Sequence, residues 1–174
     1  VVYAWRFGLR FGFDGSDIPR DLSMALGSGA VTPLAMARAY AGLANGGYRI
    51  DPYFIDRIVD GQGRAVFEAR PAFACAQCPQ RFNPDEVDPA VSMAADQTTE
   101  QAAREAPRLA AQAREPPTHF LIQSLLRDVI RRGTGKSALR LGRGDLAGKT
   151  GTTNDQRDAW FSGYNAALAT TVWV

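Results

Sequence analysis

The segment that says most about the fold is Gly148-Lys149-Thr150-Gly151-Thr152-Thr153, followed by Asn154-Asp155-Gln156-Arg157-Asp158 and Ala159-Trp160-Phe161-Ser162-Gly163-Tyr164-Asn165. Two β-type segments lie on either side of a polar turn. Together with the apolar residues before and after it, this stretch predicts strands over Leu146–Thr152, Ala159–Tyr164 and Leu168–Val174. Their connections are short, whereas parallel strands need a long crossover, so the strands are expected to be antiparallel.

Two strong helical patterns precede these strands. The first follows Thr32, a good N-cap, and ends at Asn45-Gly46-Gly47, where glycine tolerates the left-handed conformation. The second opens at Pro116-Pro117-Thr118 and closes at Arg131-Arg132-Gly133. It carries a broad apolar face made of Leu121, Ile122, Leu125, Leu126, Val129 and Ile130. The width of this face predicts burial on more than one side.

The other segments give weaker signals. Residues 1–31 are rich in glycine and aromatic residues, which predicts short helical turns and loops. A β-hairpin is expected from Tyr53–Val59 and Arg64–Glu68, joined by a glycine-containing turn. Residues 70–115 contain few large apolar side chains, so we expect an insertion or flexible extension, with a helical stretch between Thr99 and Arg114.

Composition limits the classes of function. The 174 residues are 45% hydrophobic, enough for one core or most of one. The net charge is +2 and no block of basic residues occurs, which argues against nucleic acid as a partner. No apolar stretch approaches the roughly 20 residues that span a bilayer. The chain starts at Val1 and stops within the β-branched run 170–174, so we expect both ends to continue in a longer protein.

Cys75 and Cys78 stand in a C-x-x-C spacing, and His119 is the single histidine. Zinc requires about four ligands, and a redox C-x-x-C normally opens a helix after a strand. A disulfide within a loop or two free thiols are therefore favoured over a metal site or a redox centre. His119 is expected to be a solvated residue at a helix start.

Two glycine–lysine combinations compete as candidate sites. Gly133-Thr134-Gly135-Lys136-Ser137 superficially resembles a phosphate-binding loop. However, the first glycine of that motif would have to stand at position 130, which is Ile130. The segment also follows a predicted helix, whereas the motif follows a strand. A helix-terminating turn explains it better. The second combination, Lys149-Thr150-Gly151, is one of the three motifs of penicillin-binding proteins and class A β-lactamases.

Its context makes this tripeptide specific. The run from Gly148 to Asn165 resembles the Lys-Thr-Gly strand and the following strand of class A, bifunctional penicillin-binding proteins, especially the 1A type. The segment from Leu22 to Tyr48 is similar to the one that these transpeptidases carry between their second and third motifs. The segment from Ser124 to Gly135 is similar to the helix that precedes their Lys-Thr-Gly strand. The resemblance implies an α+β fold of the penicillin-binding protein and serine β-lactamase kind, an antiparallel sheet flanked by helices. Residues 1–174 would form the C-terminal portion of a transpeptidase domain.

The resemblance also implies a site. Its substrates are peptidoglycan stem peptides ending in D-Ala-D-Ala, and β-lactam antibiotics are its inhibitors; no cofactor or metal is needed. Lys149 and Thr152 are the expected catalytic residues, with the Thr152 N–H as one oxyanion donor. The expected substrate-binding residues are Thr150, Gly151, Thr152 and Thr153. A strand at a cleft edge can pair with a peptide, and hydroxyls and an ammonium can bind its carboxylate.

One departure from the family is large. The nucleophilic Ser-x-x-Lys motif is absent, because Gly133 and Leu146 stand where Lys136 and Lys149 would need a serine, and no Ser-x-Asn occurs. We expect an upstream part of the same protein to supply both. That parent is expected to carry a glycosyltransferase domain and a membrane anchor, and to act at the periplasmic face of the bacterial inner membrane. A serine β-lactamase-like hydrolase and a non-catalytic fragment of the same fold are the alternatives.

Overall fold

Three strands near the C-terminus form the sheet that the sequence predicts. The computed structural model describes residues 1–75, 77–78, 108–153, 155 and 157–174. The strands β3 (Ala147–Thr152), β4 (Ala159–Tyr164) and β5 (Ala169–Trp173) lie in the order β3-β4-β5, with both pairs antiparallel. Each range lies within the predicted one, and threonine and aromatic residues suit a half-buried pleated surface.

Helix α2 (Pro33–Ala44) begins and ends as predicted. The hydroxyl of Thr32 accepts a hydrogen bond from the N–H of Ala35 at 3.1 Å, which satisfies one of the free donors at the helix start. At the other end, the N–H of Gly47 donates to the carbonyl of Gly42 at 2.8 Å, and Gly46 has a φ of 96°. This is the Schellman arrangement that glycine favours.

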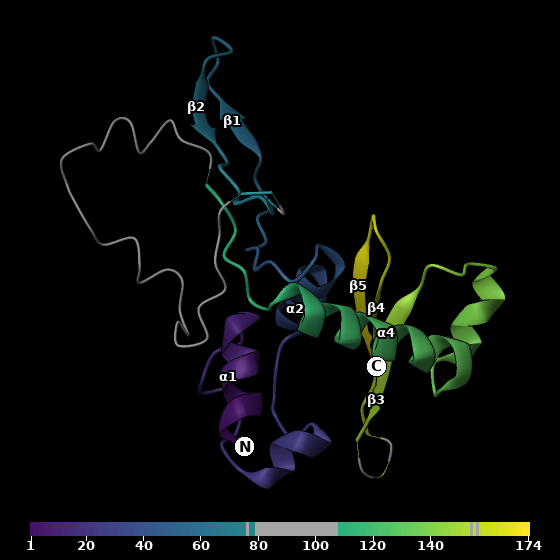
Figure 1. Cartoon of the computed structure of the whole chain (residues 1–174). Coiled ribbons are helices and arrows are strands. Elements are labelled where there is room, and N and C mark those ends of the chain that lie inside the picture. The colour runs from purple at the N-terminus through teal and green to yellow at the C-terminus, as the bar shows by residue number, and fades with distance from the viewer. Residues whose placement is uncertain (76, 79–107, 154, 156) are drawn as a thin grey trace.

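Helices α2 and α4 (Pro116–Arg132) pack against the three-stranded sheet (Figure 1). Ala147 and Tyr164 are paired across β3 and β4, so they share one face of the sheet. The buried cluster on that face consists of Phe11, Ala39, Leu43, Ala113, Ala147 and Tyr164. Ile122 and Leu126 of α4 pack against it. This arrangement of helices and antiparallel strands confirms the α+β class.

The apolar face of α4 is buried on one side only among the described residues, so the prediction of burial on more than one side is wrong here. Ile130 is 1% exposed, whereas Leu121 and Leu125 are 61% and 66% exposed. Positions 122, 126 and 130 follow one helical stripe toward the sheet. Positions 121 and 125 lie about 100° around the helix from that stripe, and no described element covers them.

The N-terminal segment contains a more regular helix than expected. Helix α1 (Val2–Arg10) spans nine residues, and a 3-10 helix, η1 (Leu22–Leu26), follows. The prediction of short helical turns and loops fits η1, but α1 is a longer helix than it allows. Its Gly8 is explained by packing, because a Cβ there would lie 2.7 Å from the Cδ1 atom of Ile18. Gly8, which suggests a loop in the sequence, instead allows the Ile18 side chain to pack closely against helix α1.

The predicted hairpin is confirmed, with both strands shorter than expected. Strands β1 (Arg57–Val59) and β2 (Ala65–Glu68) are antiparallel, and Figure 1 shows them projecting away from the three-stranded sheet. In the turn, the Asp60 carboxylate accepts from the N–H groups of Gln62 and Arg64 at 2.9 and 3.0 Å. Residues 53–56 and Arg64, for which the sequence predicts strands, lie outside β1 and β2.

The end of the segment predicted to be an insertion is extended. The helix expected over Thr99–Arg114 is wrong for its described part, and its residues 99–107 lie outside the described residues. Phe73 and Leu109 form a parallel bridge, and Tyr48 and Gln112 form an antiparallel one. Pairing with distant residues here overrides local helix propensity. The insertion over residues 70–115 stays a prediction.

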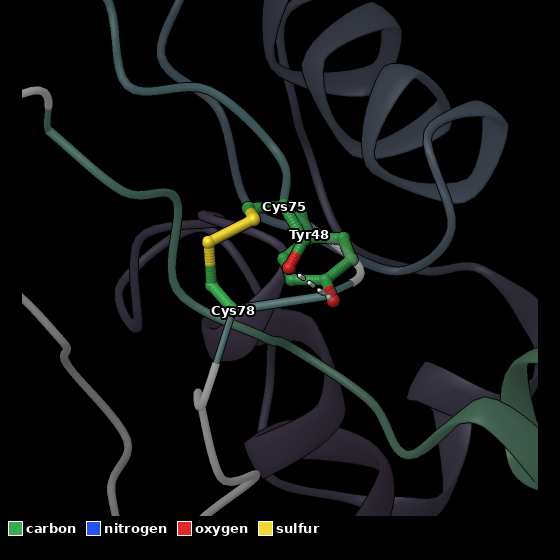
Figure 2. The surroundings of a disulfide bond; sticks show 3 residues. All are labelled: Tyr48, Cys75 and Cys78. Atoms are coloured by element: carbon green, nitrogen blue, oxygen red, sulfur yellow. Dashed lines mark hydrogen bonds between the residues drawn. A yellow bond between two sulfur atoms is a disulfide. The ribbon is translucent and has the colours of Figure 1, made fainter.

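A disulfide joins Cys75 and Cys78, one of the states that the sequence leaves open. Figure 2 shows the Tyr48 side chain beside it, with the Tyr48 hydroxyl donating to the carbonyl of Cys75 at 3.2 Å. Tyr48 is 7% exposed. The loop that contains the disulfide is therefore tied to the segment just after α2.

His119 is half-buried, so the prediction of a solvated residue is wrong. Its Nδ1 atom is buried and has no hydrogen-bond partner among the described residues. The first turn of α4 packs against the turn after α2, and a Cβ at Gly47 would lie 3.4 Å from that atom. Burial lowers the pKa of His119, because the charged imidazolium loses its hydration.

Candidate functional site on strand β3

Strand β3 presents Lys149, Thr150, Gly151 and Thr152 at an edge of the sheet. In the described sheet β3 pairs with β4 alone, so its second edge has no strand beside it. The backbone N–H and carbonyl groups of such an edge can pair with an extended peptide. Figure 1 shows β3 crossing behind α4, and the two elements are in contact.

The side chains of β3 alternate between two faces. Lys149 pairs with Ser162 and Gly151 with Trp160, on the same face as the buried Ala147. Lys149 itself is exposed, and its Nζ atom donates to the carbonyl of Thr150 at 2.6 Å. The ammonium is thereby held next to the strand edge. Thr150 and Thr152 belong to the opposite face.

Thr150 has a hydroxyl partner from another element. Its Oγ1 atom lies 2.6 Å from the Oγ1 atom of Thr134, in the turn that follows α4. Sequence reasoning misses Thr134 as a site residue. The only signal for it is the Gly133-Thr134-Gly135 turn, which the end of a helix is enough to explain.

The hydroxyl of Thr153 takes part in the turn between β3 and β4. It accepts from the N–H of Asp158 at 2.9 Å, and the N–H of Thr153 donates to the Asp158 carbonyl at 3.1 Å. The Asp158 carboxylate in turn accepts from the Nε1 atom of Trp173 at 2.8 Å. Trp173 stacks on Trp160, with ring centroids 5.7 Å apart. These contacts hold the end of β3 that carries Thr152.

Glycines bring β3 and β4 close together. A Cβ at Gly148 would lie 2.8 Å from the carbonyl oxygen of Ser162, and a Cβ at Gly163 would lie 3.2 Å from the carbonyl oxygen of Ala147. A Cβ at Gly151 would lie 3.2 Å from the Cβ of Trp160. The backbone of β3 is thus fixed by close contacts along the strand.

The described residues contain neither a metal centre nor a membrane-spanning helix. No group of three or more of their His, Cys, Asp and Glu side chains is placed to hold a metal ion. No described helix is both long enough and apolar enough to cross a membrane.

Comparison with known protein families shows which family the chain belongs to. The family model described as the penicillin-binding protein transpeptidase domain matches residues 13–174, which include all of β3 and the turn that contains Thr134. The chain belongs to this family. This match confirms the resemblance to the transpeptidases of penicillin-binding proteins and the expected fold.

Sequence and structure similarity to individual proteins supports the same family assignment. The chain is 39% identical to penicillin-binding protein 1A of Neisseria lactamica and 41% identical to that of Pseudomonas aeruginosa, over 100% and 95% of its own length. It covers only 18% and 22% of those two proteins. The crystal structure of penicillin-binding protein 1A from Haemophilus influenzae aligns with 99% of this chain and 26% of that one, at 33% identity and a TM-score of 0.78. The expected similarity to the 1A type is thereby confirmed.

Proposed function

We propose that this chain is part of a peptidoglycan D,D-transpeptidase, which cross-links stem peptides ending in D-Ala-D-Ala through a serine acyl-enzyme. The observation that carries the proposal is that β3 is an edge strand of the described sheet, with Lys149 on one face and Thr150 and Thr152 on the other. Membership of the transpeptidase family supports it. In the proposal the chain supplies the substrate-binding strand, and an upstream part of the same longer protein supplies the nucleophile.

The chemistry of β3 suits a peptide with a C-terminal carboxylate. An extended peptide that pairs with the free edge has its scissile amide aligned by backbone hydrogen bonds. The hydroxyls of Thr150 and Thr152 donate to the carboxylate, and the Lys149 ammonium adds a favourable charge. Because Gly151 has no side chain, the peptide backbone can approach the strand closely. Thr153 lies at the end of this surface, where its hydroxyl maintains the turn.

In the reaction, the serine oxygen attacks the carbonyl of the penultimate D-Ala and forms a tetrahedral oxyanion. The Thr152 N–H and the N–H of the nucleophile itself stabilise that oxyanion. The terminal D-Ala leaves with a proton, and the amine of a second stem peptide then attacks the acyl-enzyme. β-Lactam antibiotics acylate the same serine. Neither cofactor nor nucleic acid has a role in this proposal.

The longer protein is proposed to act at the periplasmic face of the bacterial inner membrane. There it would also carry a membrane anchor and a peptidoglycan glycosyltransferase domain. This setting follows from the similarity to proteins of the 1A type. It also fits a Cys75–Cys78 disulfide, because disulfides persist in oxidising compartments.

The two lysines of the chain provide a matched test in the longer protein. Lys149→Ala removes the ammonium at the strand edge, whereas Lys136→Ala removes an exposed ammonium on the 3-10 helix η4 (Lys136–Leu141). We expect Lys149→Ala to slow acylation by a penicillin about 10- to 100-fold, since a charge-assisted hydrogen bond contributes about 1.5–3 kcal/mol. Lys136→Ala should acylate at the normal rate, and both variants should melt near the parent temperature.

Two results would count against the proposal. If Lys149→Ala acylates normally in the folded protein, the lysine has no part in binding the carboxylate. If the acyl-enzyme of the unmodified protein is hydrolysed within seconds, the protein is a β-lactamase-like hydrolase. The lifetime of the acyl-enzyme is followed by intact mass spectrometry.

A further inference from the structure

We infer that Thr134 is a positioning residue for the proposed reaction: it orients the Thr150 hydroxyl as a donor toward the carboxylate of the substrate. The inference rests on the proposed function, because it assigns the partner of a residue in the proposed carboxylate site. It starts from the 2.6 Å contact between the Oγ1 atoms of Thr134 and Thr150, which join the turn after α4 to β3.

The number of hydrogens in this contact determines its direction when substrate is bound. Each threonine hydroxyl has one hydrogen to donate and two lone pairs to accept with. A carboxylate can only accept, so the Thr150 hydrogen must point at the substrate. The contact with Thr134 then survives only if Thr134 donates to the Thr150 oxygen. This donation also polarises the Thr150 hydroxyl and strengthens its bond to the carboxylate.

The backbone around Thr134 is held at a fixed place relative to α4. The N–H groups of Gly133 and Gly135 both donate to the carbonyl of Val129, at 3.1 and 3.0 Å. A Cβ at Gly133 would lie 2.8 Å from the Cα of Val129, and one at Gly135 would lie 2.8 Å from the Cδ1 of Ile130. Glycine at both positions therefore lets the turn close tightly on the end of the helix.

The fixed turn gives α4 a second role beside packing. Ile130 is 1% exposed, so the last turn of α4 is anchored in the core. Because the turn that contains Thr134 is bonded to the end of α4, the position of the Thr134 hydroxyl is fixed relative to the core as well. The Gly133-Thr134-Gly135 turn thus presents a hydroxyl to β3 from outside the Lys-Thr-Gly motif.

A double-mutant cycle in the longer protein tests this inference. The variants are Thr134→Val, Thr150→Val and the two combined, and each substitution removes a hydroxyl at nearly constant volume. Acylation rates are measured with a penicillin and with its methyl ester, which lacks the anionic carboxylate. We expect Thr134→Val to slow acylation by the free acid about three- to tenfold, the rate equivalent of one neutral hydrogen bond, and to leave the ester unaffected.

The cycle also shows whether Thr134 acts through Thr150. In the Thr150→Val background, adding Thr134→Val should cause no further loss. Thr134→Ser should restore the parent rate, because it keeps the hydroxyl. Ser137→Ala, which removes an exposed hydroxyl from η4, is the matched control and should acylate both compounds normally.

The outcomes separate this inference from the proposed function. Equal rates for Thr134→Val and the parent, equal losses with acid and ester, or additive losses in the double variant would each overturn the role of Thr134. The proposed function would stand in these cases, provided that Thr150→Val is selective for the free acid. If Thr150→Val is not selective, the carboxylate site itself is wrong. A partly unfolded variant lowers both rates equally, so it cannot imitate the expected selectivity.

Discussion

The hydroxyls near the edge of β3 have different surroundings, and these surroundings separate their roles. Thr150 lies 2.6 Å from a second hydroxyl, and Thr153 is bound to Asp158 in the turn. Thr152 is exposed at the end of the strand. In the proposed reaction its hydroxyl meets the carboxylate and its N–H meets the oxyanion, so one residue would serve two groups of the substrate.

These two roles of Thr152 can be separated by a single substitution. Thr152→Val removes the hydroxyl at similar volume and keeps the backbone N–H. We expect acylation by a penicillin to fall about tenfold, in line with the loss of a hydrogen bond to a charged group. Acylation by the methyl ester of the same penicillin should be unchanged, because the oxyanion donor remains. Similar losses with both compounds would show that this hydroxyl does not bind the carboxylate.

His119 makes folding stability dependent on pH. Burial lowers its pKa from 6.5, so the unfolded chain takes up a proton at a higher pH than the folded chain. The stability that this group contributes is therefore complete above about pH 6.5, and it is lost as the pH falls through that value toward the lower pKa of the folded state.

A variant without a titrating group tests this dependence. His119→Phe keeps a ring and removes the buried Nδ1 atom that has no partner among the described residues. Between pH 8 and pH 5 the melting temperature of the unmodified protein should fall more than that of the variant. Parallel melting curves over this range would mean that the pKa of His119 is the same in the folded and unfolded states.

Helices and strands whose ends are set by neighbouring residues are predicted correctly from the sequence. The prediction of helix α2 is correct, because Thr32 caps its start and Gly47 closes its end within a few residues. The three predicted strands agree with β3, β4 and β5 within a residue at each end, because their turns are short and polar. The Lys-Thr-Gly strand can therefore be located from the sequence alone.

Contacts between distant segments account for the wrong predictions. The described part of Thr99–Arg114 is extended because Leu109 pairs with Phe73 and Gln112 with Tyr48, which composition does not reveal. Gly8 suggests a loop but permits packing against Ile18. Thr134 escapes prediction for the same reason, because its partner Thr150 comes from another element. His119 is half-buried and not fully solvated, because the turn after α2 lies close to its Nδ1 atom.

The close approach of β3 and β4 can be tested at Gly148. A Cβ there would lie 2.8 Å from the Ser162 carbonyl oxygen and 3.0 Å from the Cα of Gly163, and backbone atoms cannot move aside easily. Gly148→Ala should lower the free energy of unfolding by about 1–3 kcal/mol. Gly144→Ala is the matched control, because a Cβ there meets nothing within 4 Å. Denaturant titration of the two variants measures the difference, and equal midpoints would contradict the predicted crowding.

For the whole molecule, the proposed function divides one site between the strand that binds the substrate and a nucleophile outside this chain. Within its 174 residues the sequence contains neither Ser-x-x-Lys nor Ser-x-Asn. In the proposed function, the residues of β3 bind the substrate and an upstream part of the longer protein supplies the nucleophilic oxygen. The exposed face of α4, with Leu121 and Leu125, is consistent with a larger surrounding domain in the proposed longer protein.

This division leads to a prediction for the isolated chain of 174 residues: it binds no penicillin covalently. The chain is incubated with a fluorescent penicillin, denatured and separated on a gel, beside the longer protein as a positive control. Circular dichroism and size-exclusion chromatography first establish that the isolated chain is folded and not aggregated, since an unfolded chain would also remain unlabelled. The exposed leucines of α4 make this check necessary. We expect a fluorescent band for the longer protein and none for the folded chain. A stoichiometric band on the chain would mean that one of its own side chains is the nucleophile, and the division of the site between two parts of a longer protein would be wrong.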